Sequence, residues 1–219
     1  MGDSTWIFSL AVLVLSVISH EVSHGYAASA LGDPTARLQG RLTLNPIPHI
    51  DPLGSIFLPA LLILSNSPIL FGWAKPVPVN PYNLRNGKWG EALVAAAGPG
   101  ANLLLALAFG LIVRFGMGTA LTDQFILLSL MIVTTNVLLA VFNLVPIPPL
   151  DGSKILYSFL PYRAAMSLQQ MEARMMSGGI ALMLIMVALF VFVASPIINT
   201  LVVLVTHLIT GIPMPNILG

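Results

Sequence analysis

Residues 20–24 read His-Glu-Val-Ser-His, an H-E-x-x-H pattern inside a run of Val, Leu and Ile. On a helix, residues four apart share one face, so His20 and His24 can both present a ring nitrogen to one Zn²⁺ ion. Glu21 lies beside them, where it can act on water rather than bind the metal. Ionisable side chains are costly at membrane depth and usually functional there. The pattern therefore predicts a zinc site with an adjacent general base rather than two structural histidines.

Two histidines leave a catalytic zinc site incomplete, because such a site usually has three protein ligands and one open position. The chain has no cysteine, so thiolate ligands are excluded. The carboxylates considered for the third ligand are Asp33, Asp51, Glu91, Asp151 and Glu172. We favour Asp151 because three prolines just before it break a helix, and irregular backbone at membrane depth is tolerated where it lines a cavity. The alternative is that Asp151 only forms an Asp-Gly turn.

The composition indicates an integral membrane protein. Of the 219 residues, 57% are hydrophobic and 8% are charged, whereas a soluble domain has about 25% charged residues. A membrane-spanning helix needs about 20 apolar residues. The candidate spans are residues 5–31, 91–114, 123–146, 178–194 and 197–211, the last two joined by a tight turn at Ser195-Pro196. We expect residues 1–219 to form a single transmembrane domain, in which residues 53–71 are re-entrant or interfacial.

The region after the first span has a different pattern. Residues 37–44 alternate polar and apolar side chains, which is typical of a strand or hairpin. Residues 73–87 are rich in proline and asparagine and are predicted to be extended with turns. The expected fold is an all-α polytopic membrane protein with five to six transmembrane helices and a short β-hairpin after the first.

Lysine and arginine predict the orientation. If residues 53–71 do not cross the membrane, Arg114 lies alone on one side and the other eight basic residues lie opposite. The positive-inside rule favours this arrangement, with the N-terminus outside and the C-terminus in the cytoplasm. It also brings Asp151 to the same side as His20 and His24, which supports Asp151 as the third ligand.

Two asparagines near the predicted site are further candidates. Asn102 and Asn143 could bind a substrate backbone or stabilise an oxyanion, or they could form interhelical hydrogen bonds. The net charge of +1 says nothing about nucleic acid, and because no basic patch or aromatic-basic run suggests it, we expect no nucleic-acid partner. Nothing in the sequence indicates an oligomeric state.

Three elements occur in a recognisable order: the H-E-x-x-H pattern, AAAGPGANLLLAL (95–107) and NLVPIPPLDG (143–152). Over residues 16–156 the chain resembles the site-2 protease family of intramembrane zinc metalloproteases, in a compact prokaryotic branch without PDZ or CBS domains. The resemblance implies one Zn²⁺ per chain held by His20, His24 and Asp151, with Glu21 as general base. It also implies a core of three spans, with a short sheet and a membrane-associated loop between the first two.

The expected function is intramembrane zinc endopeptidase activity in a prokaryotic plasma membrane. The substrate would be a transmembrane segment of another protein, cut in regulated intramembrane proteolysis. A substrate helix must unwind before cleavage, and residues 37–44 could hold it by β-addition. The alternative is a non-proteolytic zinc-binding or metal-transporting membrane protein. Glu21 separates the two, because metal binding alone does not require it.

Overall fold

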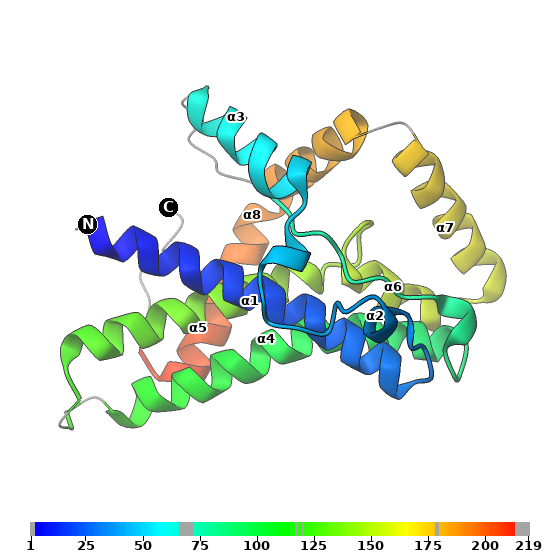
Figure 1. Ribbon diagram of the computed structural model, residues 1–219. Coiled ribbons are helices and arrows are strands. Elements are labelled where there is room, and N and C mark those ends of the chain that lie inside the picture. The colour runs from blue at the N-terminus through cyan, green and yellow to red at the C-terminus, as the bar shows by residue number, and fades with distance from the viewer. Residues whose placement is uncertain (1–2, 66–71, 117, 120, 178–179, 213–219) are drawn as a thin grey trace.

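The computed structural model describes residues 3–65, 72–116, 118–119, 121–177 and 180–212. Within these residues every regular element is a helix, and three long helices dominate (Figure 1). They are α1 (Asp3–Ala30), α4 (Lys88–Gly116) and α5 (Asp123–Asn143). Each of them is long and apolar enough to cross a membrane, at the places where the sequence predicts the first, second and third spans.

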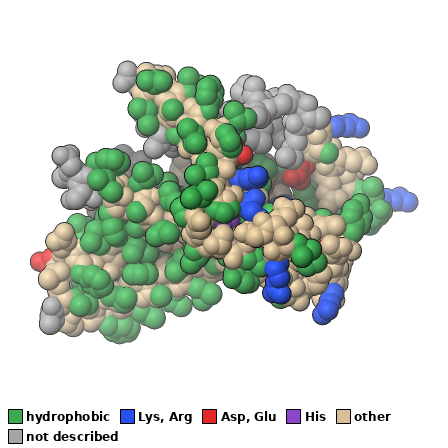
Figure 2. Space-filling view, viewed as in Figure 1, with side chains coloured by type: hydrophobic (Ala, Val, Ile, Leu, Met, Phe, Trp, Pro, Cys, Tyr) green, Lys and Arg blue, Asp and Glu red, His purple; other side chains and the backbone are tan. Residues whose placement is uncertain are grey.

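These three helices pack against one another and leave much apolar surface exposed. Between 28% and 33% of the residues in their most apolar windows are buried within the protein. Large side chains such as Trp6, Leu104 and Phe115 lie on the outside. Figure 2 shows hydrophobic side chains covering one half of the molecule, while Lys and Arg gather at the other end. The exposed apolar surface is that of a membrane protein.

Helix α8 (Ile180–Thr210) packs against α4 and α5. The buried cluster between them consists of Ala106, Val133, Val137, Ile198 and Val202. The predicted turn at Ser195-Pro196 is wrong, because α8 continues through Pro196. A proline removes only one backbone donor, and a helix held by its neighbours tolerates that loss. The prediction of five to six spans is not confirmed, since three helices in the described part meet the length and hydropathy of a span.

The chain between α1 and α4 is irregular. It forms the short helical segments α2 (Thr35–Leu38), η1 (Ile47–His49), η2 (Pro52–Phe57) and α3 (Leu58–Leu64). The apolar helix Pro52–Leu64 is shorter than a membrane span. The rest of the predicted 53–71 element, residues 66–71, lies outside the described residues, so its re-entrant or interfacial position stays a prediction.

The predicted β-hairpin at residues 37–44 is not seen. Thr35–Leu38 is helical, and the chain turns at Gly40, where φ is +64° and Arg41 N donates to Ala36 O. The apolar residues Leu38 and Leu44 are exposed. Their alternation with polar residues therefore does not mark a buried face, which is the assumption behind interpreting it as a strand.

Residues 73–80, which we call the strap, form no regular element, and a turn follows at residues 85–87, within the stretch 73–87 that is predicted to be extended with turns. The strap leads into η3 (Pro81–Asn83) and then into α4. After α5 come α6 (Asp151–Phe159) and α7 (Tyr162–Ser177), and Figure 1 shows α7 standing out at the edge of the molecule. Helix α6 packs on α4, and its first residue, Asp151, reaches the C-terminal half of α1 at His20 and His24.

Candidate metal centre

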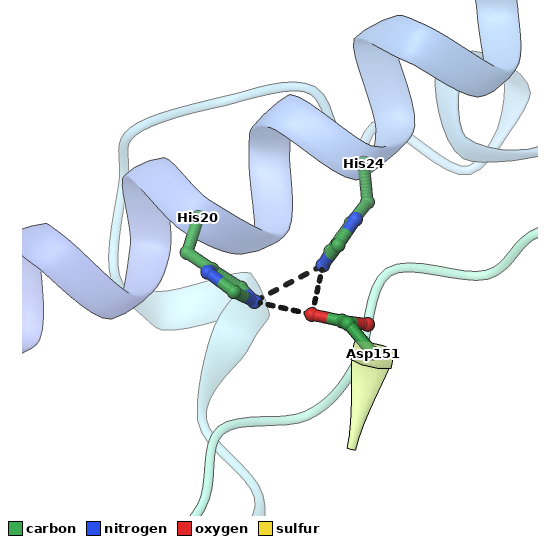
Figure 3. A group of neighbouring side chains, drawn as sticks. All are labelled: His20, His24 and Asp151. Carbon is green, nitrogen blue, oxygen red and sulfur yellow. Dashed lines mark hydrogen bonds and ion pairs between the residues drawn. The ribbon is translucent and has the colours of Figure 1, made fainter. Parts of the chain in front are cut away.

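The side chains of His20, His24 and Asp151 converge on one point (Figure 3). His20 Nε2 lies 3.0 Å and His24 Nε2 3.2 Å from Asp151 Oδ2, and the two Nε2 atoms are 3.1 Å apart. All three residues are buried. Four ligands at zinc's usual bond lengths lie roughly 3.3 Å from one another. The two nitrogens and one oxygen therefore fit three corners of a tetrahedral zinc site.

The opposite nitrogen of each imidazole has a hydrogen-bond acceptor. His20 Nδ1 donates to Asn102 Oδ1 at 2.7 Å, and His24 Nδ1 donates to the Val94 carbonyl at 2.7 Å. Because both acceptors are oxygens, each Nδ1 carries the proton and each Nε2 keeps a free lone pair toward the cluster. This is the tautomer that a metal ligand requires.

Asn102 belongs to a buried polar network that joins α1, α4 and α5. Its Nδ2 donates to Asn136 Oδ1 at 2.8 Å, and Asn136 Nδ2 donates to Ser16 Oγ at 2.9 Å. Asn102 and Asn136 have no exposed surface, and Asn102 is not part of the cavity wall. Its contacts are those of the interhelical alternative, and they orient His20. They give no support to a direct contact between Asn102 and substrate.

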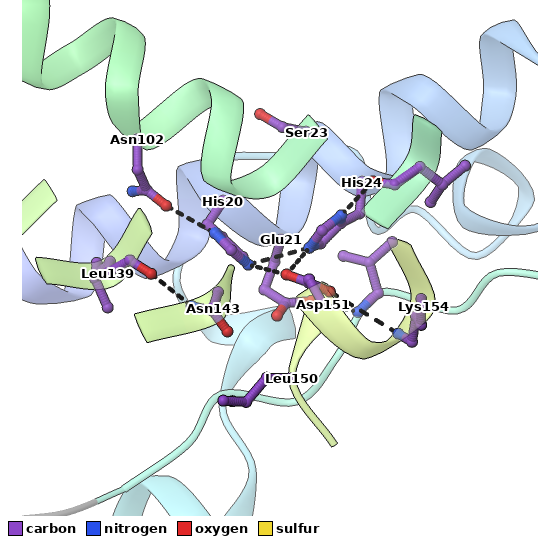
Figure 4. A network of polar contacts seen from close by, with 12 residues as sticks. His20, Glu21, Ser23, His24, Asn102, Leu139, Asn143, Leu150, Asp151 and Lys154 are labelled. Carbon is purple, nitrogen blue, oxygen red and sulfur yellow. Dashed lines mark hydrogen bonds and ion pairs between the residues drawn. The ribbon is translucent and has the colours of Figure 1, made fainter. Parts of the chain in front are cut away.

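A cavity of about 480 Å³ opens beside the cluster, with His20, Glu21, His24, Asn143 and Asp151 in its wall. Glu21 accepts a hydrogen bond from the Val77 backbone amide at its Oε2 atom, with a distance of 2.8 Å. Asn143 donates from Nδ2 to the Leu139 carbonyl one turn earlier (Figure 4). The cavity wall therefore contains both the candidate metal ligands and the predicted general base, and the substrate-binding role of Asn143 stays a prediction.

Two glycines allow the helices to meet at this site. A Cβ atom on Gly98 of α4 would lie 2.5 Å from His24 Nε2 and 2.7 Å from His20 Cε1, so the imidazoles occupy the space that a side chain would fill. A Cβ atom on Gly152 would lie 2.2 Å from the Leu144 carbonyl oxygen. The Asp-Gly pair is thus not a free turn: Asp151 begins α6, and Gly152 lets α6 pack against the end of α5.

The charge at the cluster suits a cation. The Oδ2 atom of Asp151 stands 3.0 Å from His20 Nε2 and 3.2 Å from His24 Nε2, so a carboxylate oxygen and two imidazole nitrogens face the same point. Lys154 Nζ lies 3.9 Å from the other carboxylate oxygen, and the Lys154 side chain is half exposed. A cation at this point would therefore meet one carboxylate oxygen and two imidazole lone pairs.

The other carboxylates considered for the third ligand lie elsewhere. Asp33 accepts hydrogen bonds from the strap, and Asp51 caps η2 through Leu53 N and Gly54 N. Glu91 and Glu172 line the cavity but are not in the cluster. The third ligand predicted from the distribution of basic residues, Asp151, is thus the carboxylate that the structure places beside His20 and His24.

Several residues of the site are not predicted from the sequence. Asn136 has a signal, since a polar amide in the middle of an apolar span indicates a buried hydrogen bond. Gly98 lies in a run of small residues that indicates close helix packing without naming its partner. Val77 has no signal at all, because its contribution is a backbone amide.

The fold and the cluster define a helical membrane protein with a buried group of side chains that could hold a metal ion. Comparison with known proteins agrees with this class. The model of peptidase family M50 matches residues 112–186, which include Asp151. No solved structure shows a significant match to the chain.

Curated relatives extend the comparison to most of the chain. Over 176 residues the chain is 37% identical to "Putative zinc metalloprotease YwhC" of Bacillus subtilis (strain 168), a match covering 76% of this chain and 75% of the relative. It is 33% identical over 155 residues to "Putative zinc metalloprotease Rip2" of Mycolicibacterium smegmatis (strain ATCC 700084 / mc(2)155), covering 67% of this chain and 55% of the relative. The chain belongs to peptidase family M50, the site-2 protease family. This confirms the resemblance seen in the sequence, and the relatives' names support a zinc metalloprotease.

Proposed function

We propose that this protein is an intramembrane zinc endopeptidase that hydrolyses peptide bonds in or near transmembrane segments of other membrane proteins. One observation carries the proposal: His20, His24 and Asp151 meet at hydrogen-bonding distance in the wall of a cavity that also contains Glu21. A protein that only binds or transports a metal needs the first three residues but has no use for a carboxylate beside them.

The chemistry follows from the residues present. His20 Nε2, His24 Nε2 and Asp151 Oδ2 would hold the zinc ion, which when bound activates water and polarises a peptide carbonyl. Glu21 accepts the proton of the attacking water at its carboxylate and passes it to the leaving amine nitrogen. Asn102 and the Val94 carbonyl keep both imidazoles in the required tautomer. Asn143, at the cavity wall, is available to a substrate carbonyl or amide.

The setting supports a membrane substrate. Helices α1, α4 and α5 are long and apolar enough to span, and His20, Glu21 and His24 lie on α1. The bacterial relatives support a multi-pass protein of a prokaryotic plasma membrane. The distribution of basic residues favours the N-terminus outside and the site toward the cytoplasm. Its partners would then be the lipid bilayer and a transmembrane protein or peptide.

The test uses purified protein in detergent and a fluorescent peptide that contains one transmembrane segment. The wild type should bind one zinc ion per chain and cleave the peptide. Glu21→Gln should keep the zinc and lose at least a thousandfold in kcat, because the proton acceptor is gone. Asp151→Ala should lose zinc affinity and activity together.

Asp123→Ala is the matched control for Asp151→Ala, since Asp123 begins α5 far from the cluster. It should keep both zinc and cleavage. A wild type that binds zinc but cuts no peptide, together with a Glu21→Gln variant that behaves identically, would overturn the proposal in favour of a metal-binding or metal-transporting protein.

A further inference from the structure

The strap lies against α1 at the turn that carries His20, Glu21 and His24. Backbone hydrogen bonds hold the strap to α1 and to the segment before it. Its backbone amides donate to Gly54 O from Trp73 (3.2 Å), to His49 O from Lys75 (2.9 Å) and to Glu21 from Val77 (2.8 Å). The Val77 bond is the one among these that reaches a residue of the site. No second hydrogen-bond partner of the Glu21 carboxylate occurs among the described residues.

We propose that the Val77 amide positions the Glu21 carboxylate for proton transfer, and that the buried Asp33 sets the place of this amide by anchoring the strap at Asn80. This inference rests on the proposed function. It makes Val77 and Asp33 positioning residues, which act through Glu21 rather than on the substrate.

The prolines of the strap single out this amide. Pro76 and Pro78 have no N–H, so Val77 supplies the only backbone donor of the segment 76–78. The prolines also fix φ and reduce the conformations open to the strap. The Val77 amide, held in a segment of restricted backbone conformation, therefore donates to Glu21.

Packing seats the same residue tightly against α1. The Val77 side chain is 7% exposed. A Cβ atom on Gly25, the residue after His24, would lie 2.9 Å from Val77 Cγ1 and 2.5 Å from Leu42 Cδ2. Without a side chain at Gly25, the strap can approach α1 closely enough for its amide to reach Glu21. Val79 packs on a buried cluster that includes Val94, whose carbonyl accepts the His24 hydrogen bond.

Asp33 anchors the far end of the strap. It is fully buried just beyond α1 and accepts hydrogen bonds from the backbone and hydroxyl of Thr35, from Asn80 N at 2.7 Å and from Asn83 Nδ2 at 3.0 Å. Glu21 thus lies within α1, and Asp33 lies three residues after its end. They accept amides from two points of one strap, three residues apart, so that Asp33 holds the strap in register with Glu21.

The sharpest test removes the Val77 N–H without changing the side chain. Val77 is replaced with its α-hydroxy analogue, which turns the amide into an ester, in full-length protein assayed with the fluorescent transmembrane peptide. We expect kcat to fall about ten- to hundredfold, the range for a hydrogen bond to a charged group, with KM and zinc stoichiometry unchanged. The same ester replacement at Val79, whose amide has no hydrogen-bond partner among the described residues, is the control and should retain kcat within about threefold.

A second variant tests the link to Asp33. Asp33→Asn should lower kcat without changing zinc content, and combining it with the Val77 ester should add little further loss, because both act through one contact. An ester protein with wild-type kcat, or one in which KM alone changes, would overturn the inference while the wild type still cleaves. A wild type that cleaves nothing would instead overturn the proposed function and the inference with it. Should Asp33→Asn not fold, the ester comparison decides alone.

Discussion

His20 Nδ1 lies 2.7 Å from Asn102 Oδ1, and this hydrogen bond joins α1 to α4 across 82 residues of sequence. The Asn102 amide is itself fixed by Asn136, so the acceptor cannot rotate away. The orientation of the His20 imidazole thus depends on two side-chain amides in other helices, Asn102 in α4 and Asn136 in α5.

We therefore expect Asn102→Ala to weaken zinc affinity about ten- to hundredfold, the usual cost of losing the partner of a metal-binding histidine. Competition with a calibrated chelator measures it. Asn143→Ala is the matched control, because Asn143 lines the cavity but does not contact the cluster, and it should bind zinc as the wild type does. Equal zinc affinity in the two variants would show that Asn102 does not orient His20.

Gly98 provides a second test of the site geometry. In Gly98→Ala the new methyl group would overlap both imidazoles, so we expect at least a tenfold loss of zinc affinity. Gly100→Ala lies on the same helix, where a Cβ atom would meet nothing within 4 Å, and it should bind zinc normally. Both changes raise helix propensity equally, so the difference between them reports the steric contact. Zinc content after dialysis is the measurement.

Asp33 should make stability depend on pH. Burial acts to raise its pKa, but hydrogen bonds from Thr35, Asn80 and Asn83 dominate and hold the pKa below its ordinary value. Its contribution is therefore present above the pKa of an unfolded carboxyl, about 4, and is lost as the pH falls through the lower folded value. Asp33→Asn should cost about 1–3 kcal/mol at pH 7. Melting curves in detergent should show this difference from wild type shrinking below pH 4, and a constant difference would contradict it.

The hydroxyl of Tyr157 in α6 donates to Glu172 Oε2 in α7 at 3.0 Å. Burial, with the neighbouring Glu172 carboxylate, raises the pKa of Tyr157 to about 12, so the phenol remains a donor at neutral pH. We expect Tyr157→Phe to reduce the free energy that holds α7 against α6 by about 1 kcal/mol, because this hydrogen bond is lost. Hydrogen exchange over residues 162–177 should become faster, with zinc content unchanged. Tyr162→Phe, at a side chain that is 77% exposed, is the control and should leave exchange unaltered.

The features that could be predicted from sequence are the local ones and those that topology constrains. The four-residue spacing of His20 and His24 needs only a helix to bring them together. The three long helices follow from continuous apolar runs. Asp151 could be chosen because charge placement put it on the same side as the histidines, and the structure brings it into contact with them.

The errors have physical causes. The alternation at residues 37–44 predicts a half-buried strand, but Leu38 and Leu44 are exposed, so the pattern carries no information about a core. Pro196 predicts a helix end, although packed helices tolerate a proline. The pairing of His20 with Asn102 and the contact of Val77 with Glu21 join distant segments. A single sequence does not specify which distant segments will meet.

The third member of the cluster stands 131 residues after the first. An ion held by His20 and Asp151 would close that stretch of chain into a loop, much as a disulfide does, and remove conformations from the unfolded chain. The metal would then serve as a cross-link between α1 and α6 as well as a reagent. Chelation should accordingly lower the melting temperature and release the start of α6 from α1, so that the protein loses thermal stability along with activity.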